Sequence, residues 1–175
     1  SRFILIHPTS RWRFKCISVQ TMRLVAQRLV EQGEKLVFTS GNDPAECSMI
    51  EEIVQGLPSE SFCSLAGAIT IQELGALIES CAALLCVDSL PFHMASALKA
   101  PVVVLFGPTS EVTWGPWRNP RARVLTEKMS CRPCYLDGCG GGKVSDCLQS
   151  ISLARILLEL EVAAKIGTSC LRVID

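Results

Sequence analysis

Short apolar runs alternate with amphipathic segments along the first hundred residues of the chain. The runs at 3–6, 36–39 and 84–87 have the length and composition of buried strands. Between them lie helical patterns such as 19–31, which keeps its apolar residues on one face and is followed by Gly33. Parallel strands need crossover connections, and helices supply them. The alternation therefore predicts an α/β fold, a parallel sheet with helices on both faces.

The remaining elements follow from caps and breakers. Pro44 is placed at the first position of a helix. Thr70 and Glu73 form a capping-box pattern. After about residue 121 the alternation gives way to a Cys/Gly-rich loop. The further expected strands cover about 62–65, 102–106 and 123–126; the further expected helices cover 44–55, 70–80, 89–98 and about 152–165, and the loop covers about 129–148.

The composition narrows the class of protein. A chain of 175 residues is the size of one domain, and its 17 basic and 17 acidic residues leave no net charge to attract a nucleic acid. No apolar run of about 18 residues and no export signal is seen, so a cytoplasmic location is expected. The ten cysteines are then expected to be reduced. The strand that begins directly at residue 3 indicates a piece cut from a longer protein.

Polar groups follow two apolar strands at the point where each strand ends. Asp88 and Ser89 follow the strand at 84–87, and Gly107 and Thr109 follow the strand at 102–106. Ligands of open parallel sheets bind at this carboxyl edge, and a helix N-terminus there favours phosphate. We therefore expect a nucleotide or another phosphorylated ligand at this edge.

Each of these residues also has a purely structural interpretation. Asp88 could cap the helix that follows it. His93 lies four residues beyond Ser89 on the same helix face and could face the ligand, or it could bond to a loop. Gly107 could admit a ligand close to the backbone, or it could simply belong to a turn.

The loop that follows the first strand combines hydroxyl groups with cations. Thr9, Ser10 and Lys15 are suited to a diphosphate, although a solvated basic loop has the same composition. As an exposed loop residue, Lys15 is expected to add little to stability. Glu46, after the second strand, could accept hydrogen bonds from ribose hydroxyls or could be an ordinary helix glutamate.

The late cysteines are candidates for a metal site. Cys131 and Cys134 have C-x2-C spacing, but Cys139 and Cys147 are spaced C-x7-C, unlike a zinc ribbon. We expect structural thiols and no required metal. Gly138 and the glycines at 140–142 precede Lys143, but the segment lacks the P-loop pattern and is only weakly indicative of a second phosphate-binding loop.

Many of these residues occur in the order and spacing of a known family. The motifs are Ile6-His7-Pro8-Thr9-Ser10 with Arg13-Phe14-Lys15, Asp88-Ser89 with His93-Met94-Ala95 and Ala97-Leu98, Pro101, Leu105-Phe106-Gly107-Pro108-Thr109, Trp114-Gly115-Pro116-Trp117, and the Cys-x-x-Cys segment that ends in Cys147-Leu148. With them the chain resembles glycosyltransferase family 9, the ADP-heptose:lipopolysaccharide heptosyltransferases, and it is most similar to members of heptosyltransferase III type.

The resemblance implies a Rossmann-like domain, the C-terminal half of a GT-B glycosyltransferase, in which 1–175 binds the nucleotide-sugar donor and the N-terminal acceptor domain is absent. Thr9 and Lys15 would hold the diphosphate and Glu46 the ribose. Asp88, Ser89 and His93 would contact phosphates and sugar, and Ser10, Gly107 and Thr109 would complete the donor site. The family's catalytic base lies in the other half, so no catalytic residue is assigned here, and no cofactor is expected.

The implied partners are ADP-heptose and, through the other half, the lipopolysaccharide core. The resemblance also allows peripheral association with the cytoplasmic face of the inner membrane of a Gram-negative bacterium. Two other classes of function fit the residues. One is a non-catalytic nucleotide-binding module, and the other is a metal-binding interaction domain built on the late cysteines.

Overall fold

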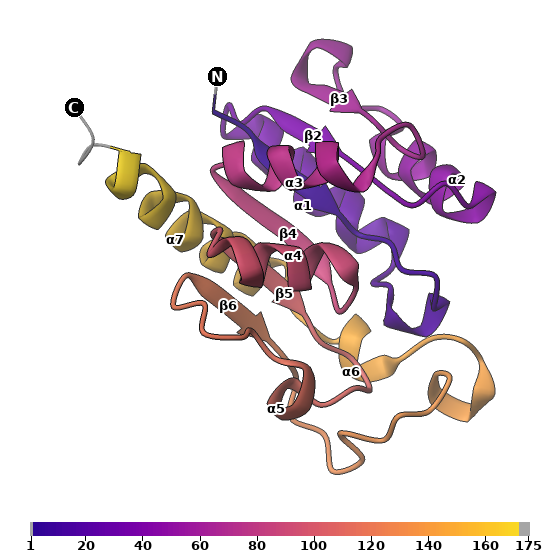
Figure 1. Ribbon diagram of the computed structural model, residues 1–175. Coiled ribbons are helices and arrows are strands. Elements are labelled where there is room, and N and C mark those ends of the chain that lie inside the picture. Colours follow the sequence, from indigo (N-terminus) through magenta and orange to yellow (C-terminus); the bar gives the residue numbers. More distant parts are fainter. Residues whose placement is uncertain (1, 172–175) are drawn as a thin grey trace.

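Six parallel strands form a single sheet in the computed structural model, which describes residues 2–171 (Figure 1). The strand order is β3-β2-β1-β4-β5-β6, and every neighbouring pair is parallel. The predicted α/β fold is thereby confirmed. The strands are β1 (Ile4–His7), β2 (Leu36–Phe38), β3 (Phe62–Ser64), β4 (Ala83–Val87), β5 (Val102–Leu105) and β6 (Ala122–Leu125).

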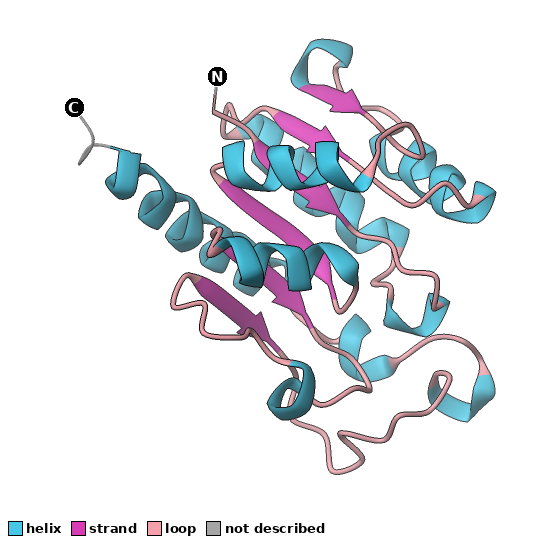
Figure 2. Ribbon diagram, in the orientation of Figure 1, coloured by secondary structure: helices cyan, strands magenta, loops and turns pink. Residues whose placement is uncertain are grey.

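Helices cover both faces of the sheet, as the alternation predicts (Figure 2). One buried apolar cluster joins the sheet to α1, α2 and α7, and a second cluster joins the opposite face to α3 and α4. The α-helices are α1 (Val19–Glu31), α2 (Pro44–Val54), α3 (Ile71–Ser80), α4 (Leu90–Leu98), α5 (Glu111–Trp114), α6 (Asp146–Gln149) and α7 (Leu153–Leu171); short 3-10 turns are η1 (Arg13–Lys15), η2 (Ser59–Ser61) and η3 (Cys139–Gly141).

The predicted helix starts agree with the observed caps. Asp43 accepts a hydrogen bond from the Ala45 N–H before Pro44, and Thr70 with Glu73 forms the complete capping box of α3. These caps satisfy backbone N–H groups that a helix start leaves without partners. The sequence predicts these two helix starts correctly because the two partners of each hydrogen bond lie within three residues of each other.

The late part of the chain differs from prediction in detail. The segment 129–148 is mostly loop, as expected, but α5 and α6 were not predicted, because four residues are too few to show a helical period. Helix α7 continues to Leu171, beyond the expected end near 165, although Gly167 and Thr168 are weak helix formers. Within residues 2–171, no helix is both long and apolar enough to cross a bilayer.

The centre of the sheet is buried on both faces, which explains why β4 and β5 are continuous apolar runs. Leu85 of β4 is fully buried in the cluster beneath α1 and α7. We expect Leu85→Ala to lower the free energy of unfolding by about 2–5 kcal/mol, because it removes buried methyl groups and leaves a cavity. Denaturant unfolding measures this loss.

The control is Leu158→Ala on the outer face of α7, where the leucine is 58% exposed. That variant should change stability by no more than about 0.5 kcal/mol. Equal losses of unfolding free energy in the two variants would contradict the assignment of Leu85 to the buried core and of Leu158 to the surface.

Candidate functional site

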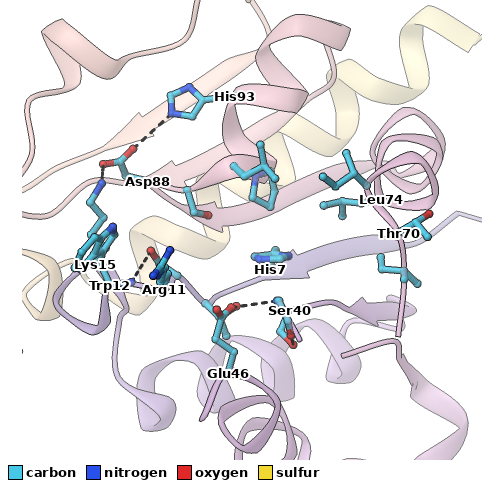
Figure 3. A pocket seen from close by; sticks show the side chains of 18 of the residues that line it. His7, Arg11, Trp12, Lys15, Ser40, Glu46, Thr70, Leu74, Asp88 and His93 are labelled. Carbon is cyan, nitrogen blue, oxygen red and sulfur yellow. Dashed lines mark hydrogen bonds and ion pairs between the residues drawn. The ribbon is translucent and has the colours of Figure 1, made fainter. Parts of the chain in front are cut away.

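A pocket of about 490 Å³ lies at the carboxyl edge of the sheet (Figure 3). Its lining comes from the segments that follow β1, β2 and β4, and from α3 and α5. Strand β1 lies between β2 and β4, and the chain proceeds from β1 to β2 and β3 on one side before returning to β4 on the other. The pocket therefore occupies a topological switch point, where open α/β sheets bind their ligands.

Asp88 is the centre of the polar end of the pocket. Its side chain is only 4% exposed, and its Oδ2 accepts hydrogen bonds from Lys15 Nζ and Thr109 Oγ1, both at 2.7 Å. His93 Nε2 lies 3.9 Å from Oδ1. The N-cap position of α4 belongs to Ser89. Asp88 thus links three segments of the chain and does not cap the helix.

Lys15 does not occupy the position that the sequence predicts. The expectation of an exposed loop lysine is wrong, since its side chain is 20% exposed and ion-paired with Asp88. The η1 turn, which buries Phe14, directs Lys15 toward the sheet edge. Lys15 therefore supports the fold as well as lining the pocket.

Thr9 and Ser10 line the same pocket beside Arg11. The Thr9 hydroxyl is fully enclosed, and it has no hydrogen-bond partner within the described part of the chain. Such unpartnered groups are rare in proteins. Ser10 Oγ accepts a hydrogen bond from the Trp12 N–H at 3.2 Å.

Glu46 lines the pocket from the first turn of α2. Its Oε2 accepts a hydrogen bond from the Gly41 N–H at 3.1 Å. A Cβ atom on Gly41 would lie 2.9 Å from Glu46 Oε1, so this carboxylate position requires a glycine at 41. Glu46 and Asp88 place two carboxylates on the lining of the pocket.

Ser89 and His93 line the pocket, but Gly107 and Thr109 lie behind it. Thr109 acts through its hydrogen bond to Asp88. The Gly107 carbonyl accepts a 2.6 Å hydrogen bond from Arg132 Nε, and a Cβ atom on Gly107 would lie 3.3 Å from Leu148 Cβ. The glycine thus permits close packing of the late loop.

His7 is a pocket residue that sequence reasoning missed. It ends β1 and is 6% exposed, and its Nδ1 lies 2.9 Å from Thr39 Oγ1. Burial lowers the pKa of its imidazole to about 4. The sequence signal that could have identified His7 is its position at the end of a predicted strand, where ligands of parallel sheets bind.

Several apolar side chains that line the pocket were not predicted from the sequence, and we call them the apolar wall. They lie on helices or beside them, where an apolar residue in a pocket has the same sequence pattern as one on an ordinary surface. The residues of the apolar wall are Ile69, Ile71, Leu74, Leu90, Pro91 and Trp114.

The late cysteines differ in exposure. Cys131 and Cys139 are exposed, and Cys147 is buried, which raises the pKa of its thiol. Among residues 2–171, no group of three or more His, Cys, Asp or Glu side chains is arranged to hold a metal ion. The assignment of Cys131, Cys134, Cys139 and Cys147 as structural thiols stays a prediction.

Removal of Lys15 should now affect stability. We expect Lys15→Ala to lower the free energy of unfolding at pH 7 by about 1–3 kcal/mol, because the buried Asp88 carboxylate loses a charged partner. Denaturant unfolding measures the loss. The double variant Lys15→Ala/Asp88→Asn should recover part of it, since the neutral amide needs no counter-charge. A double variant as unstable as the sum of the two single variants would contradict this role for the pair.

His7 should make stability depend on pH. Its pKa is about 4 in the folded chain, against an ordinary value of 6.5. Above pH 6.5 the imidazole is neutral in both states. As pH falls toward 4, only the unfolded chain takes up the proton, so stability decreases by about 1.4 kcal/mol per pH unit, roughly 3 kcal/mol in all.

Unfolding of the wild type and of His7→Gln across pH 7.5–4 checks this expectation. The wild type should lose stability more steeply than the variant between pH 6.5 and 4. If the stability of the two proteins fell in parallel with pH, His7 would take up a proton in the folded chain as readily as in the unfolded chain.

Comparison with known proteins identifies relatives of this chain. Lipopolysaccharide heptosyltransferase 3 of Escherichia coli is 38% identical over 117 residues, which cover 67% of this chain and 34% of that protein. The E. coli ADP-heptose LPS heptosyltransferase II structure matches with a TM-score of 0.80 at 24% identity, over 95% of this chain and 47% of that one.

A third match is the E. coli heptosyltransferase WaaC with ADP-2-deoxy-2-fluoro heptose, with a TM-score of 0.62 at 16% identity, over 73% of this chain and 37% of that one. The chain thus spans about a third to a half of the length of these relatives. The family model of glycosyltransferase family 9 (heptosyltransferase) matches residues 1–144. The chain therefore belongs to glycosyltransferase family 9.

Proposed function

We propose that this chain is the donor-binding half of a heptosyltransferase that transfers heptose from ADP-heptose to the lipopolysaccharide inner core. The observation that carries the proposal is the switch-point pocket, which combines polar groups at Asp88 and Lys15 with the side chains of the apolar wall. A nucleotide sugar has the same division. Its base is flat and largely apolar, and its diphosphate and sugar are polar.

The polar end suits a diphosphate. Arg11 supplies positive charge, Lys15 has ammonium hydrogens beyond the one that it gives to Asp88, and Thr9 lines this end. The N-terminus of α4 adds the partial positive charge of a helix dipole. Negative charge develops on ADP as the bond to the sugar breaks, and groups already fixed in place stabilise it most effectively. Ser10 and Ser89 complete this end.

The two carboxylates have different tasks in this proposal. Glu46 accepts hydrogen bonds from the ribose hydroxyls. Asp88 would repel a phosphate placed directly against it, so in this proposal Lys15 cancels the charge of Asp88 and Arg11 supplies the positive charge that faces the phosphates. The free Oδ1 side of Asp88, near His93, then faces the sugar hydroxyls. Thr109, supported by the packing at Gly107, fixes the direction of the Asp88 carboxylate.

The acceptor and the catalytic base belong, in this proposal, to the remaining part of a full-length enzyme. The lipopolysaccharide core is a membrane-bound acceptor, so we place that enzyme in the cytoplasm, in peripheral contact with the inner membrane. Its donor domain corresponds to residues 1–175.

The proposal is tested by calorimetric titration of the chain with ADP and ADP-heptose. ADP should bind, and ADP-heptose should bind more tightly because its sugar reaches Asp88 and His93. Glu46→Gln should weaken ADP binding by about 1–3 kcal/mol. Glu51→Gln, on the exposed face of the same helix, should leave affinity unchanged. The chain alone should transfer no heptose to a truncated lipopolysaccharide, since it holds only one of two reactants.

Each outcome separates one interpretation from another. Absence of ADP binding at millimolar concentration would exclude a donor domain. Equal affinities for ADP and ADP-heptose would favour a non-catalytic nucleotide-binding module. Efficient heptose transfer by the chain alone would exclude the half-enzyme.

A further inference from the structure

His7 lines the pocket between Asp88 and Leu74 (Figure 3). Figure 3 shows the ring between the Asp88 and Lys15 side and the Leu74 side, at the end of the central strand β1. A bound molecule that reaches from Lys15 to Leu74 passes this ring (Figure 3).

The hydrogen bond to Thr39 fixes which ring nitrogen carries the proton. Thr39 is fully buried directly after β2, and within the described residues its hydroxyl has no hydrogen-bond partner besides His7 Nδ1, at 2.9 Å. If Nδ1 were the donor, the hydroxyl hydrogen of Thr39 would remain buried without an acceptor, which is costly. If Thr39 is the donor, both groups are satisfied. A neutral imidazole then carries its hydrogen on Nε2.

The Nε2 atom is open to the pocket. It has no hydrogen-bond partner among the described residues, yet it is not enclosed. Within the described residues, the side-chain atoms that are both enclosed and without a hydrogen-bond partner are Thr9 Oγ1 and Arg121 Nε, and His7 Nε2 is not one of them. Since His7 lines the pocket, its free N–H points toward the space that a ligand would fill. The lowered pKa of the ring agrees with a neutral donor at physiological pH.

We propose that His7 supplies an uncharged Nε2–H donor to an oxygen in the ribose-phosphate part of the bound nucleotide sugar, and that Thr39 is the positioning residue that fixes this tautomer. The inference rests on the proposed donor-binding function. An uncharged donor adds direction to binding without adding a third full positive charge beside Lys15 and Arg11, so it contributes little to the purely electrostatic retention of the ADP product.

The tautomer can be measured without any ligand. In the 175-residue chain labelled with ¹⁵N, two-bond proton–nitrogen correlation spectra of the imidazole distinguish the two neutral forms and the cation. At pH 7 the expected form of His7 is Nε2–H. A proton on Nδ1, or a cationic ring at that pH, would overturn the inference even if ADP binds.

Affinity for ADP gives the second measurement. His7→Phe should weaken ADP binding about tenfold, equivalent to about 1.4 kcal/mol, because the donor is lost. His7→Gln should stay within about threefold of the wild type, since its amide nitrogen can approach the position of Nε2. Thr39→Val should weaken binding severalfold, whereas Thr39→Ser, which keeps the hydroxyl, should restore it.

Thermal melts confirm that each variant is folded. If His7→Phe does not fold, the double variant His7→Phe/Thr39→Val replaces it, because it leaves no unpaired hydroxyl under the ring. Unchanged affinity in a folded variant without the donor would overturn the role of His7 and leave the donor-binding function intact. Failure of the wild type to bind ADP would instead remove the proposed function, while the spectra would still decide the tautomer.

Discussion

The buried ion pair between Lys15 and Asp88 is the contact on which the carboxyl edge of this sheet depends. A carboxylate at this depth is costly unless charged or hydrogen-bonded partners surround it. Lys15 and Thr109 supply those partners from the segments after β1 and β5, while Asp88 itself follows β4. The same contact that satisfies a buried charge therefore sets the positions of three loops at once.

A second buried charge connects the late loop to this arrangement. The Arg132 guanidinium donates to the carbonyls of Gly107 and Thr109 and pairs with Glu111 at 2.9 Å. Its partners therefore include the backbone of the residue that orients Asp88. The Cys/Gly-rich segment contributes to the site in this way through the side chain of Arg132, independently of any role of its cysteine thiols.

The pocket combines groups that act by charge with groups that act by direction. Arg11 and the ion pair of Lys15 with Asp88 carry full charges, whereas the imidazole of His7 is held by its hydrogen bond with Thr39 and the Glu46 carboxylate is held by a hydrogen bond from the Gly41 N–H. In the proposed donor-binding function, a neutral donor such as His7 adds direction to binding without adding charge.

The sequence by itself determined the succession of elements, the capped starts of α2 and α3, and the set of polar residues at strand ends, because each depends on side chains a few positions apart. Most of the predicted donor residues, from Thr9 to His93, line one pocket, because the strand order brings the ends of β1, β2 and β4 together. Only the tertiary structure decided that Lys15 pairs with Asp88, 73 positions away, that His7 meets Thr39, and that Gly107 and Thr109 support the pocket from behind. Those contacts depend on the strand order that places β1 between β2 and β4, and local periodicity is the same for any order of parallel strands.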